Sequence, residues 1–558
     1  MVGLKELPVR HDFVWGLFGE RGDINSISKI LKRVRHHFNK SLRTLPAYDQ
    51  EKQGSIVEFV VPDGLIEIER YWLQEPYAFA SILEDRRTKY YKLIEPALTK
   101  YEKKILERIY DDLQDILVLN FTTSKFEKDA FLVDKTLYLL ERYRAEISAS
   151  AVQKIIYYLR RNLLGYNKIN PLLYDPYIED ISCDGVEIPI YIYHTKYFNI
   201  ESNISFKEDE LDSFVIRMCQ LNNKHISVSQ PIVDGTIQDG SRLQAILGRE
   251  ITPRGSSFTI RKFRKDPITP IDLLGFNTCS LEMLIYLWLI IENGYNILFA
   301  GGTASGKTSM LNATSLFMPS TAKIVSIEDT RELLLYHNNW VSEITRESFA
   351  SDATGEVSMY DLLRAVLRQR PDFIIVGEVR GSEALTLFQA MSTGHATSST
   401  MHAGDLQTVI NRLTHEPINV PQMMLQSLDV LCIQEQMYIG EKRVRRSRSF
   451  VEVLNIDTET GDLGINELFS WEPSEDGFIK VGDSHIMQDI MYTRGLDASQ
   501  LRDEMGNRRK ILTYMYENKM RSYIQVSLVV QAYQSYPKMI MESVKNDTLK
   551  SMVQNMIT

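Results

Sequence analysis

Short apolar runs alternate with helix-like segments through the second half of the chain. Three such runs are residues 295–300, 322–327 and 373–377. A short continuous apolar run is typical of a strand that is buried on both faces, and strands that alternate with helices favour a parallel sheet. We therefore predict an α/β domain over residues 273–440.

The first 165 residues show a mixed pattern. Strands are expected at 55–61 and 64–68, and mostly helix over 90–119 and 125–164. These elements predict a mixed N-terminal domain over residues 1–165 that faces a partner or a membrane. Its chemistry is not evident from the sequence.

Residues 166–265 predict a separate α+β domain, and the proline-punctuated residues 266–272 predict a linker that acts as a hinge. The elements expected within this domain are a turn at 180–185, an exposed-edge strand at 188–193, a helix at 212–222, a turn at 238–241 that leads into a strand, and a strand at 256–263.

Residues 441–558 predict a C-terminal extension made of a β-hairpin and helices. Residues 449–454 are expected to pair with 465–469 across a turn at 459–462, and 497–547 are expected to be helical. An apolar stripe within these helices favours helix packing over a ligand site. The stripe consists of Tyr523, Val526, Val529 and Tyr533.

Composition narrows the class of protein. A chain of 558 residues is too long for one core, and a net charge of −9 argues against a general nucleic-acid binder. The longest apolar run, 284–291, is too short to span a bilayer, and residues 1–5 lack the apolar core of a signal peptide, so we expect a cytoplasmic protein. The four cysteines are widely spaced, which predicts neither disulfides nor a Cys-based zinc site.

The loop after the first apolar run carries the most specific motif. It reads Gly301-Gly302-Thr303-Ala304-Ser305-Gly306-Lys307-Thr308, the phosphate-binding pattern G-x-x-x-x-G-K-[ST] between a strand and a helix. Glycines let the backbone N–H groups wrap a phosphate, Lys307 can reach the β- and γ-phosphates, and Thr308 can ligate magnesium. We assign ATP binding to these eight residues and to Ser309.

Carboxylates follow the next two apolar runs. Glu328 and Asp329 end the run 322–327, and Glu378 ends the run 373–377. Acids at the carboxyl ends of parallel strands lie in the binding crevice of the sheet. Glu328 is a candidate to polarise the attacking water, and Glu378 to hold magnesium through water or to position the nucleophile. Asp329 or Glu332 can support magnesium or orient Glu328, and the alternative is that Glu328 and Asp329 are a pair of solvated acids.

Cations and histidines near these acids are weaker candidates. Arg380 follows the third run and is a candidate phosphate sensor. His395 and His402 are interpreted as hydrogen-bonding sensors, because no third metal ligand stands near them. Three arginines on or near one helix either bridge to a neighbouring subunit's nucleotide or pair with surface acids. They are Arg364, Arg368 and Arg370.

Together these motifs resemble those of the secretion ATPases of type II and type IV secretion systems, type IV pili and archaella. The resemblance is carried by the loop 301–308, the acidic box 328–330, the run 370–378, and the histidine segment 393–403, in that order. The resemblance includes the upstream segments 175–185 and 258–263, covers residues 165–440 and extends over 440–550. Within the family, the chain is similar in particular to the archaeal branch. The four-cysteine zinc module that many bacterial members carry is absent from this sequence.

The resemblance implies a RecA-like ATPase domain and a homo-hexameric ring in which residues 166–265 cap the nucleotide. It implies that Arg242 and Arg261 reach the phosphates from the cap, and that His402 belongs to the catalytic set. The ring would sit at the inner face of the membrane and act on a polytopic platform protein, moving pilin-like or archaellin-like subunits. Filament assembly or type II-like secretion would be the output.

Two other functions compete with this one. A nucleic-acid-translocating P-loop motor is disfavoured by the acidic charge, and a scaffold that does not hydrolyse nucleotide is disfavoured by intact Lys307 and Glu378. A basic amphipathic stretch within residues 27–43 favours either a helix docked on its own domain or contact with anionic lipid. The arginines 443, 445, 446 and 448 are equally consistent with a platform contact and with a solvated hairpin.

Overall fold

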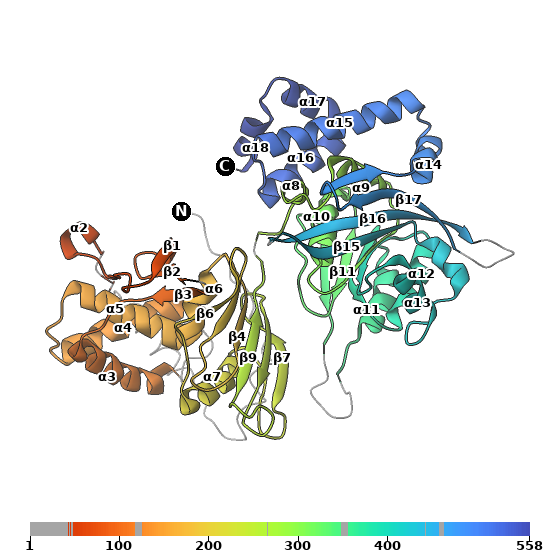
Figure 1. The fold of residues 1–558 in the computed structure, drawn as a ribbon. Coiled ribbons are helices and arrows are strands. Elements are labelled where there is room, and N and C mark those ends of the chain that lie inside the picture. The colour runs from red at the N-terminus through yellow and green to blue at the C-terminus, as the bar shows by residue number, and fades with distance from the viewer. Residues whose placement is uncertain are drawn as a thin grey trace, which may run out of the picture. The chain divides into compact units, whose positions relative to one another are not determined.

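The computed structural model describes residues 43, 45, 48–86, 88–117, 125–264, 266–346, 355–440, 442–456 and 463–557. The chain forms two compact units, Met1–Lys262 and Phe263–Thr558 (Figure 1). The predicted basic stretch within 27–43 lies outside the described residues except for Arg43, and the predicted turn at 459–462 lies outside them entirely.

Unit 1 contains one nine-stranded sheet among its described residues, in the order β1-β2-β3-β6-β5-β4-β9-β8-β7. The strands are β1 (Ile66–Gln74), β2 (Ala78–Asp85), β3 (Thr88–Ile94), β4 (Ile178–Cys183), β5 (Tyr191–His194), β6 (Phe198–Ser202), β7 (Ile232–Thr236), β8 (Arg242–Ile246) and β9 (Ser257–Arg261). The helices are α2 (Gln50–Gln53), α3 (Lys100–Leu117), α4 (Lys125–Arg142), α5 (Ala149–Leu159), η2 (Arg160–Leu164), η3 (Asn167–Ile169), α6 (Asn170–Tyr174) and α7 (Glu208–Leu221).

The sheet of unit 1 runs across residue 165, where we predicted a domain boundary. Strands β1 to β3 join the later strands through a short parallel pairing of β3 with β6. The buried carboxylate of Asp175 strengthens the join, because it accepts hydrogen bonds from the hydroxyls of Tyr71 (2.8 Å) and Tyr91 (2.7 Å). The sheet is therefore continuous across residue 165. The division of this unit into residues 1–165 and 166–265, with separate functions, stays a prediction.

Two segments of unit 1 form a different type of secondary structure from the one predicted. Residues 55–61 are not a strand; Ile56 and Val57 are buried against Phe79 and Ile94 without pairing into the sheet. Residues 90–94, predicted to be helical, belong to strand β3, in which Tyr91 and Leu93 are buried on either side of the partly exposed Lys92.

Two further corrections concern the middle of the sheet. Residues 180–183 belong to strand β4, in which Ile181 and Cys183 are fully buried, and not to a turn. Strand β5, expected at an edge, lies inside the sheet between β6 and β4. Of the helix predicted over 90–119, residues 100–117 are helical; the helix predicted over 125–164 is interrupted at 143–148, and the one predicted at 212–222 is confirmed as α7.

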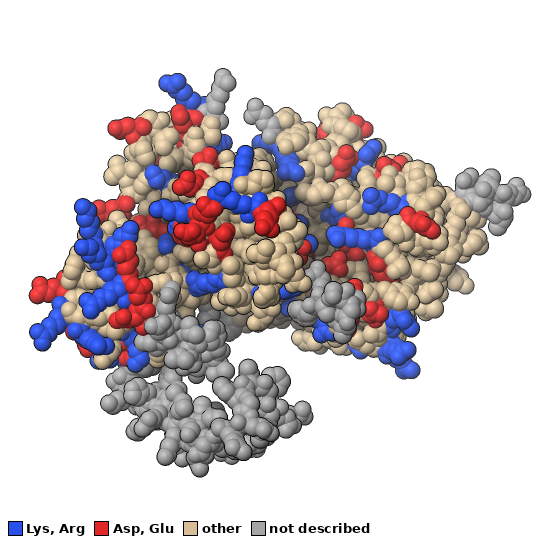
Figure 2. All heavy atoms as spheres, turned by 90° about the horizontal axis from the view of Figure 1, so that it is seen from below, with Lys and Arg blue, Asp and Glu red and all other residues tan. Residues whose placement is uncertain are grey.

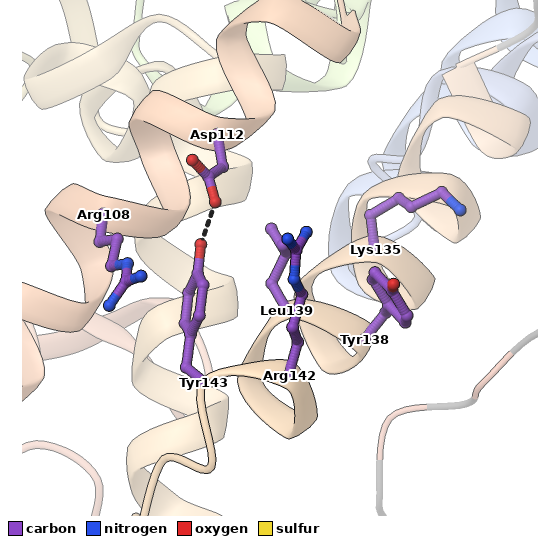
Figure 3. Close-up of a pocket in the computed structure, with 7 residues that line it drawn as sticks. All are labelled: Arg108, Asp112, Lys135, Tyr138, Leu139, Arg142 and Tyr143. Carbon is purple, nitrogen blue, oxygen red and sulfur yellow. Dashed lines mark hydrogen bonds between the residues drawn. The ribbon is translucent and has the colours of Figure 1, made fainter.

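A cavity of about 700 Å³ lies between helices α3 and α4 of unit 1 (Figure 3). Its lining is mostly polar: Arg108, Asp112, Lys135, Tyr138, Leu139, Arg142 and Tyr143. Tyr143 donates a hydrogen bond to Asp112, and the guanidinium of Arg108 lies over the Tyr143 ring at 4.2 Å. None of the predicted site residues lines this cavity.

Unit 2 contains a second nine-stranded sheet among its described residues, in the order β12-β11-β13-β14-β10-β15-β16-β17-β18. The strands are β10 (Ile297–Gly301), β11 (Ile324–Glu328), β12 (Trp340–Ile344), β13 (Phe373–Val379), β14 (Ala396–Met401), β15 (Val430–Ile439), β16 (Lys442–Ile456), β17 (Leu463–Glu472) and β18 (Gly477–Lys480). The first six strands in this order, β12-β11-β13-β14-β10-β15, are parallel to one another. Strands β16, β17 and β18 then continue the sheet with antiparallel pairing.

This arrangement confirms the predicted α/β class with a RecA-like parallel core. The predicted hairpin is also confirmed, since Phe450 pairs with Phe469 and Val453 with Ile465. The helices of unit 2 are α8 (Pro270–Gly275), α9 (Leu281–Glu292), α10 (Lys307–Thr314), η4 (Ser315–Phe317), α11 (Met359–Val366), η5 (Leu367–Gln369), α12 (Glu383–Ser392), α13 (Leu406–Thr414), η6 (Gln422–Ser427), α14 (His485–Arg494), α15 (Ala498–Glu517), α16 (Tyr523–Ser535), α17 (Pro537–Lys545) and α18 (Leu549–Ile557).

Helices cover both faces of the sheet of unit 2. On β10, Ile297 and Phe299 belong to the apolar core that contains α9, α15 and α16, whereas Leu298 and Ala300 belong to the core that contains α11, α12 and α13. Successive residues of a strand point to opposite faces, so two cores on one strand place it in the middle layer. The stripe Tyr523, Val526, Val529 and Tyr533 is buried in the first core, which confirms its predicted packing role.

Helix α9 explains the longest apolar run of the sequence. Every residue from Leu284 to Ile291 is at most 2% exposed. A helix that is apolar all round is buried on all sides. Among the described residues, no helix is long and apolar enough to cross a membrane. On the face shown in Figure 2, basic and acidic side chains are interspersed, as the modest net charge leads us to expect.

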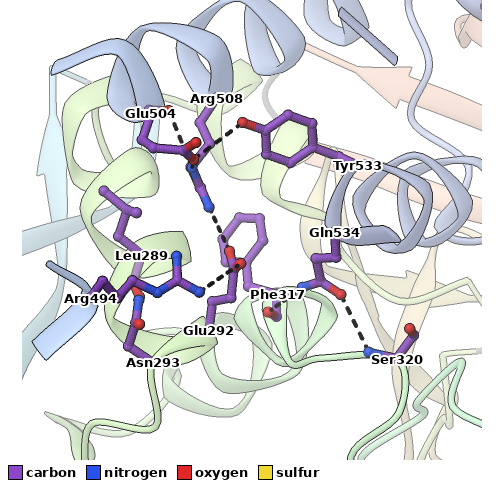
Figure 4. Close-up of polar contacts among 10 residues, drawn as sticks. All are labelled: Leu289, Glu292, Asn293, Phe317, Ser320, Arg494, Glu504, Arg508, Tyr533 and Gln534. Carbon is purple, nitrogen blue, oxygen red and sulfur yellow. Dashed lines mark hydrogen bonds and ion pairs between the residues drawn. The ribbon is translucent and has the colours of Figure 1, made fainter. Parts of the chain in front are cut away.

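A buried ion-pair network fastens α15 to α9 (Figure 4). The side chain of Arg508 is 1% exposed, and its guanidinium contacts Glu292 at 2.7 Å and Glu504 at 2.5 Å. The same guanidinium lies over the rings of Trp288 and Tyr533. Because the surrounding core excludes water, the charge of Arg508 depends on these partners.

We predict that Arg508→Met lowers the free energy of unfolding of unit 2 by about 3–5 kcal/mol, because it leaves the buried Glu292 with only the longer contact to Arg494, at 3.8 Å. Chemical unfolding followed by tryptophan fluorescence measures this loss. The control is Arg509→Met, since Arg509 is 48% exposed and pairs with Glu282 on the surface. The control is expected to change stability by less than about 1 kcal/mol. Equal losses in the two variants would contradict the role given to Arg508.

Candidate functional site

The phosphate loop lies where β10 ends and α10 begins, as predicted. Gly306 caps the helix with φ +93°, a left-handed conformation that favours glycine. A Cβ on Gly301 would lie 2.2 Å from the carbonyl oxygen of Gln434 on β15, so this position admits no side chain. These two glycines let the loop turn tightly against the sheet and leave its N–H groups at the N-terminus of α10.

Side chains within the loop are held by the loop itself. Lys307 Nζ and Ser305 Oγ both donate to the carbonyl of Gly302, each at 2.9 Å. Thr303 Oγ1 lies 2.9 Å from His402 Nε2, so the predicted sensor histidine contacts the loop. His395 does not share this contact; it lies 3.3 Å from the Thr393 hydroxyl.

The carboxyl group of Glu328 is buried at the end of β11. Its Oε1 accepts hydrogen bonds from the backbone N–H groups of Glu332 (2.9 Å) and Leu333 (3.0 Å), and its Oε2 is buried without a hydrogen-bond partner. Burial raises the pKa of Glu328 to about 7, despite the two N–H donors that lower it. A Cβ on Gly377 would lie 3.1 Å from Glu328 Cγ, so glycine on neighbouring β13 leaves room for this carboxyl group.

Glu378 is more exposed and is neutralised by Arg380. The Glu378 carboxylate contacts the Arg380 guanidinium at 2.6 Å, and Arg380 also lies 3.9 Å from Asp329 on the adjacent strand end. Strands β11 and β13 pair directly. The structure therefore brings together Glu328, Asp329 and Glu378 at one edge of the sheet, with Arg380 between the last two.

The other predicted cations lie elsewhere. Arg242 and Arg261 are direct cross-strand partners on β8 and β9 of unit 1, and both are exposed. Their predicted reach to the phosphates stays a prediction. Arg364 lies on α11 with its guanidinium over the Tyr360 ring at 5.5 Å, while Arg368 and Arg370 follow it at η5.

Sequence reasoning missed two contributors to this site. Gly377 makes space for Glu328, and Arg445 on β16 reaches the loop, where its Nε donates to the carbonyl of Ala304 at 2.9 Å. Arg445 was considered only as part of a basic cluster. The contact depends on the register of β15 with β16, which no local pattern specifies.

The residues present fit a magnesium–nucleotide complex. The loop offers backbone N–H groups at a helix N-terminus, Lys307 and Thr308 follow, and the unpartnered Oε2 of Glu328 is an acceptor that lacks a donor. Among the described residues, no group of three or more His, Cys, Asp or Glu side chains could hold a metal ion alone. Magnesium held by Thr308 and Glu378 would therefore need phosphate oxygens and water as well, which is its usual coordination.

Comparison with known proteins identifies the family. Residues 175–554 match the family described as Type II/IV secretion system protein, and residues 25–97 match the family described as PilB3-like, N-terminal. The uncharacterized protein MJ0900 of Methanocaldococcus jannaschii is 32% identical over 529 residues, which cover 90% of this chain and 94% of that protein.

Two more distant matches are to proteins named as secretion components. The type IV secretion system protein PtlH of Bordetella pertussis is 30% identical over 227 residues, 37% of this chain and 67% of that protein. The crystal structure of the VirB11 ATPase from Brucella suis is 22% identical with a TM-score of 0.25, covering 52% of this chain and 92% of that one. With more than half of its length in the family match and an archaeal relative along nearly its full length, the chain belongs to the type II/IV secretion ATPase family.

Proposed function

We propose that this protein is a cytoplasmic ATPase that converts hydrolysis of Mg-ATP into domain motion. The observation that carries the proposal is the buried carboxyl group of Glu328, which has one unpartnered oxygen and lies on the strand adjacent to Glu378, on the same sheet as a complete phosphate loop. A buried acid with a pKa near neutrality and an open acceptor is suited to general-base work.

Each residue of the site has a distinct task in this proposal. Lys307 and the loop N–H groups bind the phosphates, and Thr308 and Glu378 hold magnesium, the latter through water. Magnesium, when bound, supplies positive charge to the phosphate oxygens. Glu328 Oε2 accepts a hydrogen bond from the attacking water and orients it. His402 connects Thr303 of the loop to the end of β14 and acts as a sensor.

We propose further that the working form is a homo-hexameric ring at the inner face of the membrane. Residues 166–265 act as the cap, residues 266–272 as the hinge, and Arg242 and Arg261 reach the nucleotide of a neighbouring subunit. The cross-strand placement of these two exposed arginines supports the proposal, because both charges leave the sheet at one place. The motion would drive a membrane platform protein in pilus, archaellum or type II-like export.

ATP turnover per subunit, measured with magnesium against protein concentration, tests the proposal first. We expect a steep rise with concentration, because the site would be completed by arginines of a second subunit. Lys307→Ala is the control and is expected to lose nucleotide binding and turnover together. Constant turnover per subunit across dissociating concentrations would contradict the cap role of Arg242 and Arg261. No turnover at any concentration would contradict the proposed activity.

The pH dependence of turnover tests Glu328. We expect the rate at saturating ATP to rise between pH 6 and pH 8 through an apparent pKa near 7. Only the ionised carboxylate of Glu328 can accept a proton from the attacking water, and burial raises its pKa. In Glu328→Gln the rate is expected to fall by about 100-fold or more and to lose this dependence. A wild-type rate that stays flat over this range would contradict the assignment.

Glu378→Gln separates binding from hydrolysis. We expect ATP affinity within about threefold of wild type, because loop contacts dominate binding, and turnover at least about 100-fold lower, because the charge that positions magnesium is lost. Titration calorimetry and phosphate release measure the two effects. The matched control is Glu435→Gln on β15, an exposed acid that also pairs with an arginine, Arg448. It is expected to leave both quantities unchanged.

A further inference from the structure

Arg445 touches the phosphate loop from the side of β10 that faces away from the acids. It stands on β16 opposite Gln436 of β15, and its Nε donates to the carbonyl of Ala304 at 2.9 Å. A Cβ on Gly306 would lie 3.4 Å from Arg445 Cδ, so the side chain meets the loop at two residues. The guanidinium is therefore fixed at the loop by its strand and by the loop backbone.

Among the residues that the structure describes, Arg445 has no carboxylate within ion-pair distance. Two other arginines of the same strand do: Arg446 contacts Asp476 at 2.6 Å, and Arg448 contacts Glu435 at 3.3 Å. A guanidinium carries five N–H donors, and the Ala304 carbonyl uses one of them. A half-buried cation beside a phosphate cradle, with most of its donors uncommitted, is suited to an anionic ligand.

The sheet order indicates which part of the nucleotide Arg445 faces. Strand β10 lies between β14 on one side and β15 on the other. Glu328 and Glu378, which act at the phosphate that is hydrolysed, lie on β11 and β13, beyond β14. Arg445 lies beyond β15, on the opposite side. The terminal phosphate must lie toward the acids, so the side of Arg445 belongs to the phosphates that ATP and ADP share.

We propose that Arg445 is a nucleotide-binding residue that contacts the α- or β-phosphate of ATP and ADP alike. This inference rests on the proposed ATPase function and adds a binding residue from the β15–β16 hairpin within the same unit. Because the contact is made equally with substrate and product, its loss weakens binding without removing an interaction specific to the transition state. It therefore raises KM and leaves kcat nearly unchanged.

The test compares the affinities of the full chain for ATP and ADP in Arg445→Met and wild type, with magnesium present. We expect the Kd of both nucleotides to rise by the same factor, about tenfold, as the loss of one charge-assisted contact to phosphate implies. KM should rise to match, with kcat within about threefold. The control Arg448→Met, which removes a paired arginine of the same strand, is expected to change neither affinity.

Two conservative variants separate phosphate contact from bracing of the loop. Arg445→Lys keeps the charge and is expected to recover part of the affinity, and the advantage of Lys over Gln should shrink as salt rises. Arg445→Gln keeps a donor for the Ala304 carbonyl but not the charge, and is expected to bind like Arg445→Met. This pair decides the question even where Arg445→Met fails to fold.

Three outcomes would overturn the inference: unchanged affinity in Arg445→Met, a loss confined to ATP, or rescue by Gln but not by Lys. The first would leave Arg445 without a binding role, the second would move it to the γ-phosphate, and the third would reduce it to a brace for the loop. If wild-type protein binds neither nucleotide, the proposed function fails instead, and the variants are not needed to show it.

Discussion

The position of β10 in the middle of its sheet is the constraint on which the site depends. All five residues of this strand are buried, with parallel partners on both sides and helical layers on both faces. Burying the side chains of Ile297, Leu298 and Phe299 contributes roughly 1.5–3 kcal/mol each, so the strand end has little freedom to move. The phosphate loop starts at Gly301, which packs so closely against the Gln434 carbonyl of β15 that a Cβ would not fit. The loop is therefore placed by hydrophobic packing and shaped by glycine.

Three buried acids of unit 2, Glu452, Asp429 and Glu328, differ in how well their oxygens are satisfied by hydrogen bonds. Glu452 is 1% exposed and accepts from Tyr286, His485 and two further donors, so its charge is fully hydrogen-bonded. Asp429 accepts from the backbone and side chain of Asn296. Glu328 is equally buried, yet one of its oxygens has no partner. An unsatisfied buried acceptor costs stability, and in the proposed function the attacking water supplies the missing donor.

The sequence predicted the parts of this protein that obey local rules. Continuous apolar runs indicated the parallel strands, and glycine spacing indicated the loop, because each of these signals is contained within a few consecutive residues. Strand β3 was missed because tyrosines and lysines at 89–92 hide its alternation, and residues 55–61 were overestimated because burial of Ile56 does not require pairing. Gly377 and Arg445 could not be predicted, since their roles arise only when distant strands pair in a particular register.

The cations that we assign to the nucleotide come from both units of the chain, and in our proposal this separates binding from activation. Lys307 belongs to the loop and Arg445 to the hairpin of the same unit, so both cations proposed to bind the nucleotide within one unit lie in Phe263–Thr558. Arg242 and Arg261 belong to unit 1, beyond the predicted hinge. Their contribution would depend on where the cap stands, whereas that of Lys307 and Arg445 would not. On this proposal the site would bind ATP in any position of the cap and hydrolyse it only in one, which is the property that a motor requires.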